Sequence, residues 1–271
     1  MTHEHRLVGR ADLEPEPLAH LLEGLGKAAI SIVDLTQPLS EETPTIMLPE
    51  PFVNTPGFSL RELSRYDDRG PAWYWNAFEG GEHVGTHFDA PNHWVSGKDL
   101  DDVASVPVDR LIAPAVVIDK SAESAANPDY LLTVDHVRAW EAEHGPLPAG
   151  GWLLYRTGWD ERAHDQQAFL NADDTGPHTP GFDPECARWL AGATEIVGVG
   201  VETVGTDAGA AHSFEPAFPC HTFMLGANKY GLTQLANVAK LPPTGTVLIV
   251  APLKITGGSG SPCRVLALVP G

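Results

Sequence analysis

Short apolar runs bounded by turn-forming residues recur along this chain, and runs of this length are typical of buried strands. Four of them, each five to seven residues long, predict strands over residues 29–35, 115–119, 151–157 and 196–201. Two further runs, 247–253 and 264–269, flank the glycine-rich stretch 257–261. A flexible turn between adjacent strands favours a hairpin near the end of the chain.

Helical spacing of apolar residues is clearest in two segments between these strands. Thr133 is a suitable N-cap for a helix that Gly145 would end. Asp183 and Pro184 match the cap and first-turn preferences of a second helix over 182–190. Strands and helices together predict an α/β protein.

The N-terminal residues differ from the rest. Residues 1–28 are charged, with leucines that suggest one short helix, and we expect them to form an N-terminal arm. Residues 29–271 contain no repeat, low-complexity run or linker, and we expect them to form a single domain.

A long stretch without periodicity precedes a cluster of aromatic residues. Residues 44–69 are rich in proline, glycine and polar residues and predict a long connecting loop of the kind that covers binding sites. Trp73 and Trp75 follow, and their alternation places both indoles on one face of a strand. They would either pack in the core or form a substrate-binding wall with Phe88 and Trp94.

Composition limits the classes of partner. The chain has 271 residues, with 17 Lys and Arg against 36 Asp and Glu and a net charge of -19. Such acidity argues against nucleic acid or an anionic membrane as a partner. The three widely spaced cysteines fit a reducing cytoplasm. We find neither a signal-peptide core nor an apolar run of membrane-spanning length.

Candidate chemistry is concentrated between residues 83 and 94. His87 and Asp89 are two residues apart and share one side of an extended segment, to which a turn can return His83. Two imidazoles and a carboxylate suit zinc, manganese or iron, and three protein ligands leave a position open, as in catalytic sites. His93 would then be a free imidazole that carries a proton. The alternative is a turn-rich surface loop with scattered histidines.

The pattern His-x-Gly-Thr-His-x-Asp-x-Pro-x-His is complete from His83 to His93 and resembles the signature of the metal-dependent cyclase family of hydrolases. That family includes kynurenine formamidases, isatin hydrolases and trans-dienelactone hydrolases. The resemblance implies that His83, His87 and Asp89 bind the metal and that His93 is the acid/base. It also implies a swivelling β/β/α domain with mixed sheets and flanking helices, and assembly as a homodimer or homotetramer.

Later segments complete the predicted site. Family members with two metals are similar around His221 but have a glutamate near the position of Gln234, and this chain has no glutamate after His221. An amide is a weaker ligand than a carboxylate, so we expect one divalent metal, manganese or zinc, with Gln234 as a further oxygen ligand. His221 would contact substrate or water, unless it is a core histidine.

The turn after the strand 196–201 holds two carboxylates. Family members carry an acidic turn in a similar place, near the metal. The resemblance makes Glu202 a candidate for the site and Asp207 a candidate substrate-binding residue; the alternative is a turn with capping carboxylates.

These residues favour a metal-dependent amidohydrolase that opens or cleaves a C–N bond of a small planar aromatic substrate, such as an isatin-like cyclic amide or an N-formylkynurenine-like arylformamide. Catalysis by a serine or cysteine nucleophile lacks support, because the chain has no Gly-x-Ser-x-Gly elbow and no Cys-His signature. The alternatives are a lactone or ester hydrolase of the dienelactone type, a metal-dependent isomerase or dehydratase, and a non-catalytic ligand-binding module. The last would need no acid/base at His93.

Overall fold

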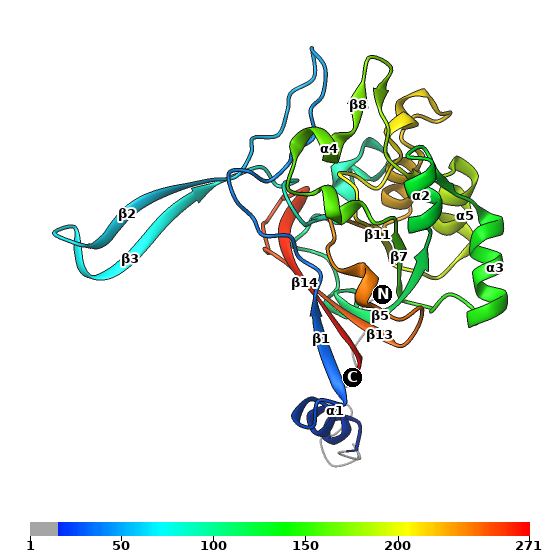
Figure 1. The fold of residues 1–271 in the computed structure, drawn as a ribbon, viewed down its shortest axis with the longest axis horizontal. Coiled ribbons are helices and arrows are strands. Elements are labelled where there is room, and N and C mark those ends of the chain that lie inside the picture. The colour runs from blue at the N-terminus through cyan, green and yellow to red at the C-terminus, as the bar shows by residue number, and fades with distance from the viewer. Residues whose placement is uncertain (1–15) are drawn as a thin grey trace.

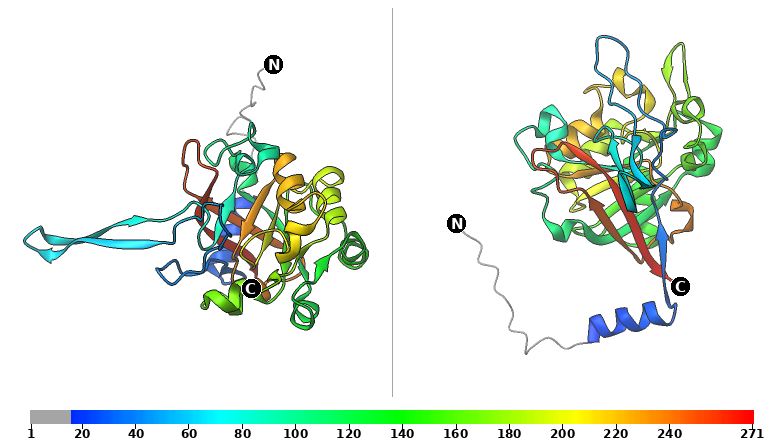
Figure 2. Two further views of the ribbon diagram at one scale, coloured as in Figure 1. Left: turned by 90° about the horizontal axis from the view of Figure 1, so that it is seen from above. Right: turned by 90° about the vertical axis from the view of Figure 1, so that its left-hand side faces the viewer.

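A computed structural model describes residues 16–271 (Figure 1). Residues 1–15 of the predicted N-terminal arm lie outside the described residues. The remainder of that arm contains α1 (Glu16–Gly26), a helix with no buried residue. Figure 2 shows α1 standing apart from the body of the protein, joined to it through β1 (Ile30–Asp34).

The body is built on an eight-stranded mixed sheet. Its strand order is β1-β14-β13-β5-β7-β11-β12-β4, and β4 also pairs with β14, so the sheet closes into a barrel. The strands β5, β7, β11 and β12 run parallel to their neighbours within that group. The bounds of the strands not yet given are β4 (His87–Asp89), β5 (Ile112–Asp119), β7 (Trp152–Arg156), β11 (Gly198–Val201), β12 (Tyr230–Thr233), β13 (Thr246–Pro252) and β14 (Gly260–Pro270).

The parallel strands are buried on both faces, which explains their continuous apolar sequences. In β7, Trp152 and Leu154 belong to the cluster inside the barrel. Leu153 and Tyr155 belong to a second cluster that packs the outer face of the sheet against α3 (Val134–His144) and α5 (Pro184–Ala193). One strand therefore serves two cores.

The helices predicted from the sequence are confirmed with their caps. The hydroxyl of Thr133 accepts a hydrogen bond from the amide of His136, and α3 ends at Gly145. The carboxylate of Asp183 accepts from the first amides of α5. The remaining short elements are α2 (Ser121–Ala126), α4 (Gln166–Leu170), β6 (Leu131–Leu132), β8 (Ala172–Asp173), β9 (Gly176–Pro177) and β10 (Gly181–Phe182).

A two-stranded hairpin projects from the body (Figures 1 and 2). It consists of β2 (Ser59–Asp67) and β3 (Gly70–Glu79), which pair only with each other, and we call it the aromatic hairpin. The predicted loop over 44–69 is therefore wrong from Ser59 onward. Neither face of β2 packs on the body, so its sequence lacks the alternation that reveals a half-buried strand.

Other strand predictions differ in detail. The first strand, expected to be buried, is an exposed or half-buried edge strand paired only with β14. The late hairpin is confirmed as the antiparallel pair β13 and β14. The strand β4 matches the extended segment expected at His87 and Asp89, whereas β12 was not predicted, because four residues are too few to show a period. Within the described range, no helix has the length and apolar character needed to cross a membrane.

Candidate metal centre

The site is built on β4, the strand that closes the barrel between β12 and β14. Because side chains alternate along a strand, His87 and Asp89 project to one side and Phe88 to the other. Phe88 is fully buried inside the barrel, with its ring centroid 5.2 Å from that of Tyr230. Its predicted role in substrate binding is therefore wrong, and Phe88 anchors β4 to the core.

Three side chains converge as the sequence predicted. One potential ligand atom from each of His83, His87 and Asp89 lies within 4.8 Å of the other two, and this is the one such group among the described residues. Asp89 Oδ1 is 2.8 Å from His83 Nδ1 and 3.3 Å from His87 Nε2. The group has the donor types and compactness that a divalent metal requires.

Outer hydrogen bonds fix which nitrogen of each imidazole faces the group. The Ser259 hydroxyl lies 2.6 Å from the Glu82 carboxylate, to which it donates, and 2.9 Å from His83 Nε2. It therefore accepts from Nε2–H and leaves the Nδ1 lone pair of His83 facing Asp89. His87 Nδ1 lies 2.7 Å from the Gly85 carbonyl oxygen, which can only accept, so Nδ1 carries the proton and Nε2, which lies 3.0 Å from the Thr233 hydroxyl, carries the lone pair.

Two glycines make room for these side chains. A Cβ on Gly260 would lie 2.5 Å from His83 Cε1 and 2.7 Å from the Phe88 carbonyl oxygen. A Cβ on Gly231 would lie 2.8 Å from Asp89 Oδ2. Both glycines come from strands paired with β4, so the neighbouring backbones must approach the site without side chains.

The pKa shifts in the site favour an ionised carboxylate at Asp89 and a neutral imidazole at His93. Burial raises the pKa of Asp89, but positive charge at His87 and the close contacts with His83 and His87 outweigh burial, and the net pKa lies well below its usual value. Burial lowers the pKa of His93 to about 3, against the opposing negative charge of Asp89. At neutral pH, His93 is therefore a neutral imidazole able to accept a proton.

His93, Trp94 and His221 line the space beside the group. The His93 ring centroid is 3.9 Å from that of His83 and 5.6 Å from that of His221. Trp94 lies over His221 with centroids 4.7 Å apart, and its indole nitrogen donates to Thr222 Oγ1. Asp207 is also present, with Oδ2 2.5 Å from His221 Nδ1. The structure thus brings together four further residues that the sequence predicted for the site: His93, Trp94, Asp207 and His221.

The side chains of Gln234 and Glu202 are both buried but differ in their hydrogen bonding. The Gln234 side chain is 1% exposed, and within residues 16–271 neither of its amide atoms has a hydrogen-bond partner. A buried amide without partners fits a ligand to a cation, and Gln234 directly follows Thr233, whose hydroxyl lies 2.9 Å from His87 Nδ1. Glu202 instead accepts hydrogen bonds from the amides of Thr157 and Gly158, in the turn that follows β7.

The structure does not bring Trp73 and Trp75 to this site within one chain. Both lie on the aromatic hairpin and are 44% and 55% exposed, so the core-packing interpretation is wrong. Their rings contact each other, with centroids 5.7 Å apart. At the root of the hairpin lies a largely apolar hollow of about 520 Å³, to which Phe78 and Leu253 contribute.

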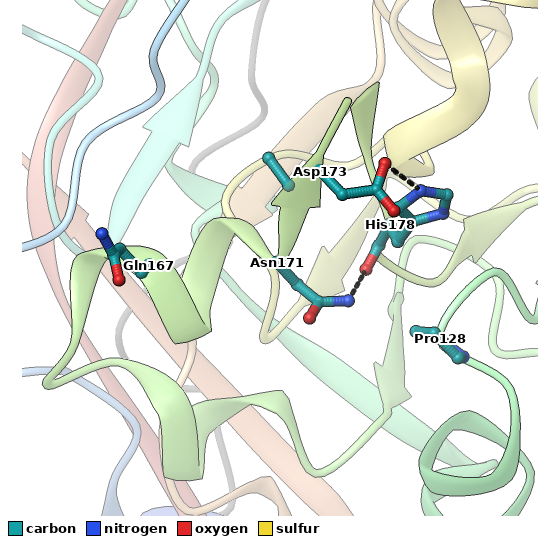
Figure 3. Close-up of a pocket in the computed structure, with 6 residues that line it drawn as sticks. Pro128, Gln167, Asn171, Asp173 and His178 are labelled. Carbon is teal, nitrogen blue, oxygen red and sulfur yellow. Dashed lines mark hydrogen bonds and ion pairs between the residues drawn. The ribbon is translucent and has the colours of Figure 1, made fainter. Parts of the chain in front are cut away.

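A separate hollow of about 390 Å³ lies beside the β8–β9 turn (Figure 3). His178 stands at its edge between two carboxylates, with Nδ1 2.9 Å from Asp129 and Nε2 3.2 Å from Asp173. Hydrogen bonds to these carboxylates raise the pKa of His178. Sequence reasoning did not single out this cluster, whose members come from separate loops.

Known proteins resemble this chain over most of its length. The Cyclase family model matches residues 33–208. An isatin hydrolase from Roseibium aggregatum is 52% identical over 256 residues, covering 92% of this chain and 97% of that protein. A kynurenine formamidase from Paracidovorax citrulli is 28% identical over 196 residues, covering 69% and 76%. A crystal structure of an isatin hydrolase bound to the product analogue thioisatinate has a TM-score of 0.93 at 50% identity, covering 96% of this chain and 100% of that one.

The chain therefore belongs to the cyclase family, which confirms the resemblance inferred from the motif and the fold class that it implied. Isatin hydrolase and kynurenine formamidase are amidohydrolases that act on C–N bonds other than peptide bonds, and this chain is an enzyme of that class.

Replacing Gly260 with alanine tests the packing around His83. The new Cβ would displace the imidazole, because its other near contact is backbone. We expect manganese or zinc affinity, measured by isothermal titration calorimetry, to fall about 10- to 100-fold. Gly192→Ala is the matched control, since a Cβ there meets nothing within 4 Å. Unchanged affinity in Gly260→Ala would show that His83 does not hold the ion.

Glu202 gives a pH dependence of stability. Burial, with the charge of Asp160, raises its pKa from 4.5 to about 7. The folded state then binds more protons than the unfolded state between these values, so stability present below pH 4.5 is lost as pH rises to about 7. Glu202→Gln removes this component, about 3 kcal/mol in total.

Urea unfolding at several pH values measures this effect. The stability of wild type relative to Glu202→Gln should fall steadily from pH 4.5 to 7, the range between the two pKa values. The exposed Glu195→Gln variant should track wild type throughout. A constant difference between wild type and Glu202→Gln would contradict the shifted pKa.

Proposed function

We propose that this enzyme hydrolyses the cyclic amide of isatin or of a closely related N-aryl lactam. The single observation that carries the proposal is the convergence of His83, His87 and Asp89 next to His93, in a chain 52% identical to an isatin hydrolase. Kynurenine formamidase is a more distant relative, at 28% identity, so an arylformamide is less well supported as substrate.

One divalent metal, manganese or zinc, completes the proposed site. His83, His87 and Asp89 would hold it, and the unpartnered amide of Gln234 would supply a further oxygen. The donor set fits either ion, because histidine and carboxylate serve both. When bound, such an ion supplies Lewis-acid chemistry: it polarises a carbonyl and makes water more acidic.

His93 is the proposed acid/base. Its ring lies 3.9 Å from that of His83, beside the proposed metal, where it accepts a proton from the attacking water. The water oxygen bonds to the amide carbon, the C–N bond breaks, and His93 returns the proton to the leaving nitrogen. The products are a carboxylate and an arylamine, which for a lactam remain in one molecule.

Aromatic rings favour a planar substrate. Trp94 and His221 present adjacent ring faces beside His93. Stacking on such faces contributes roughly 0.5–1.5 kcal/mol per pair beyond the burial of area. A flat bicyclic lactam fits this wall better than an aliphatic amide.

Turnover of isatin tests the proposal. The manganese-loaded enzyme should open the isatin ring in a spectrophotometric assay, a chelator should abolish turnover, and manganese should restore it. His93→Ala should retain the metal, measured by mass spectrometry, and lose about 10²- to 10⁴-fold in kcat. The exposed His164→Ala is the matched control.

Two outcomes would count against these assignments. A metal-loaded enzyme that binds but never hydrolyses isatin, arylformamides or lactones would favour the non-catalytic module. Loss of the metal together with turnover in His93→Ala would make His93 a ligand.

We also propose that the aromatic hairpin contacts a second copy of the chain in a homodimer or homotetramer. The hairpin exposes six large side chains, Leu60, Tyr66, Trp73, Tyr74, Trp75 and Phe78. A lone hairpin is marginally stable in water, and an apolar surface of this kind is typical of protein contacts. The buried, free cysteines suit a reducing cytoplasm as the compartment.

Light scattering after size-exclusion chromatography tests the oligomer. Trp75→Glu should shift the mass toward the monomer, because it places a charge on the exposed apolar surface without disturbing the barrel. Glu79→Gln, on the same hairpin, should leave the mass of wild type. An identical oligomer in all three proteins would exclude the hairpin as the contact.

A further inference from the structure

Asp207 lies at the centre of a buried hydrogen-bond group beside the site. It is 8% exposed and follows β11 in the turn that faces the start of the segment His221–Leu225. Its Oδ1 accepts from the amide of Cys220 at 2.7 Å, and its Oδ2 accepts from the amide of His221 at 3.1 Å. Oδ2 also lies 2.5 Å from His221 Nδ1. One carboxylate therefore holds both the backbone and the ring of His221.

This arrangement determines which nitrogen of His221 is available. A carboxylate only accepts, so Nδ1 carries a proton and donates to Asp207. The other ring nitrogen, Nε2, then faces away from Asp207 and carries a second N–H when the ring is cationic, the form that the Asp207 carboxylate stabilises. The ring itself is fixed between Asp207 and the face of Trp94, whose centroid is 4.7 Å away.

We propose that Asp207 is a positioning residue that aims the Nε2–H of His221 at the substrate oxygen on which negative charge develops. This rests on the proposed hydrolysis of a lactam, in which the attacked carbonyl oxygen gains charge. A preorganised donor at such an oxygen lowers the barrier more than the same donor in water.

Charges around His221 favour the cationic ring, in which Nε2 carries the donated proton. Burial lowers its pKa, but the hydrogen bond and charge of Asp207 and the charge of Asp89 outweigh burial and raise it. The other titratable groups facing it are His93, which is neutral at pH 7, and the thiol of Cys220, which burial also keeps neutral. Removing the charge of Asp207 should therefore let His221 lose its proton at lower pH.

A capping role alone would give a different result from a positioning role. If Asp207 only stabilises the turn at Cys220, its loss should lower stability and leave the ionisation of His221 unchanged. If it acts through the ring, its loss should affect catalysis only while His221 is present. The variants Asp207→Asn, His221→Gln and their combination separate these cases.

The experiment measures kcat/KM for isatin with manganese-loaded enzyme across pH. Asp207→Asn and His221→Gln should each lose about 10- to 100-fold, and the double variant should lose no more than His221→Gln. In Asp207→Asn, the alkaline limb of the profile should move to lower pH. Wild-type kcat/KM in Asp207→Asn, or losses that multiply in the double variant, would overturn the proposal.

A second readout is independent of turnover. Proton NMR of wild type should show a low-field signal from the Nδ1–H shared with Asp207, absent in Asp207→Asn and His221→Gln. Absence of this signal in wild type would overturn the proposal even if Asp207→Asn failed to fold. Asp129→Asn, which breaks the remote pair with His178, should keep both the signal and the kcat/KM profile.

The two proposals fail in distinguishable ways. A wild-type enzyme that shows the NMR signal but opens no isatin would refute the proposed substrate and leave the Asp207–His221 pair intact. An active wild-type enzyme whose Asp207→Asn variant is equally active would refute the positioning role alone.

Discussion

The structure depends on one close approach, between a buried carboxylate and an imidazole lone pair. Asp89 Oδ1 lies 2.8 Å from His83 Nδ1, while the other nitrogen of His83 already donates to Ser259. Two lone pairs at this distance repel unless a proton or a cation lies between them. His87 Nε2 lies 3.3 Å from the same oxygen and adds a third potential metal-ligand atom. The site is therefore formed as a receptor for positive charge.

This constraint explains why the site lies where the barrel closes. The strand β4 pairs on one side with β12 and on the other with β14, so both neighbours contribute to it. Phe88 anchors β4 inside the barrel, and this orients His87 and Asp89 outward. Gly231 and Gly260 let the flanking backbones approach without a clash. The closed barrel therefore holds the three side chains of the metal centre in place.

The local part of this picture could be predicted from sequence, and the long-range part could not. His83, His87 and Asp89 lie within seven residues, so their spacing alone indicated convergence. The partner of His83, Ser259, is 176 positions away, and only the fold brings it near. The glycine run at 257–260 was interpreted as a flexible turn, although Gly260 also marks a close backbone approach.

Two errors have a common physical origin. Phe88 was placed at the site because it lies next to ligands in sequence, but alternation along β4 turns it into the core. Trp73 and Trp75 were expected either at the site or in the core, but the hairpin that carries them projects from the body, so neither indole packs in the core (Figure 1). In both cases the sequence gives the residue type but not the direction of the side chain, because that direction depends on which strands pair.

Anomalous diffraction from crystals of the manganese-loaded enzyme tests the central claim most directly. We expect one peak per chain, within bonding distance of His83 Nδ1, His87 Nε2 and an oxygen of Asp89, with His83 Nε2 still hydrogen-bonded to Ser259. A fully loaded crystal with no peak among these three side chains, or with its manganese elsewhere in the chain, would contradict it.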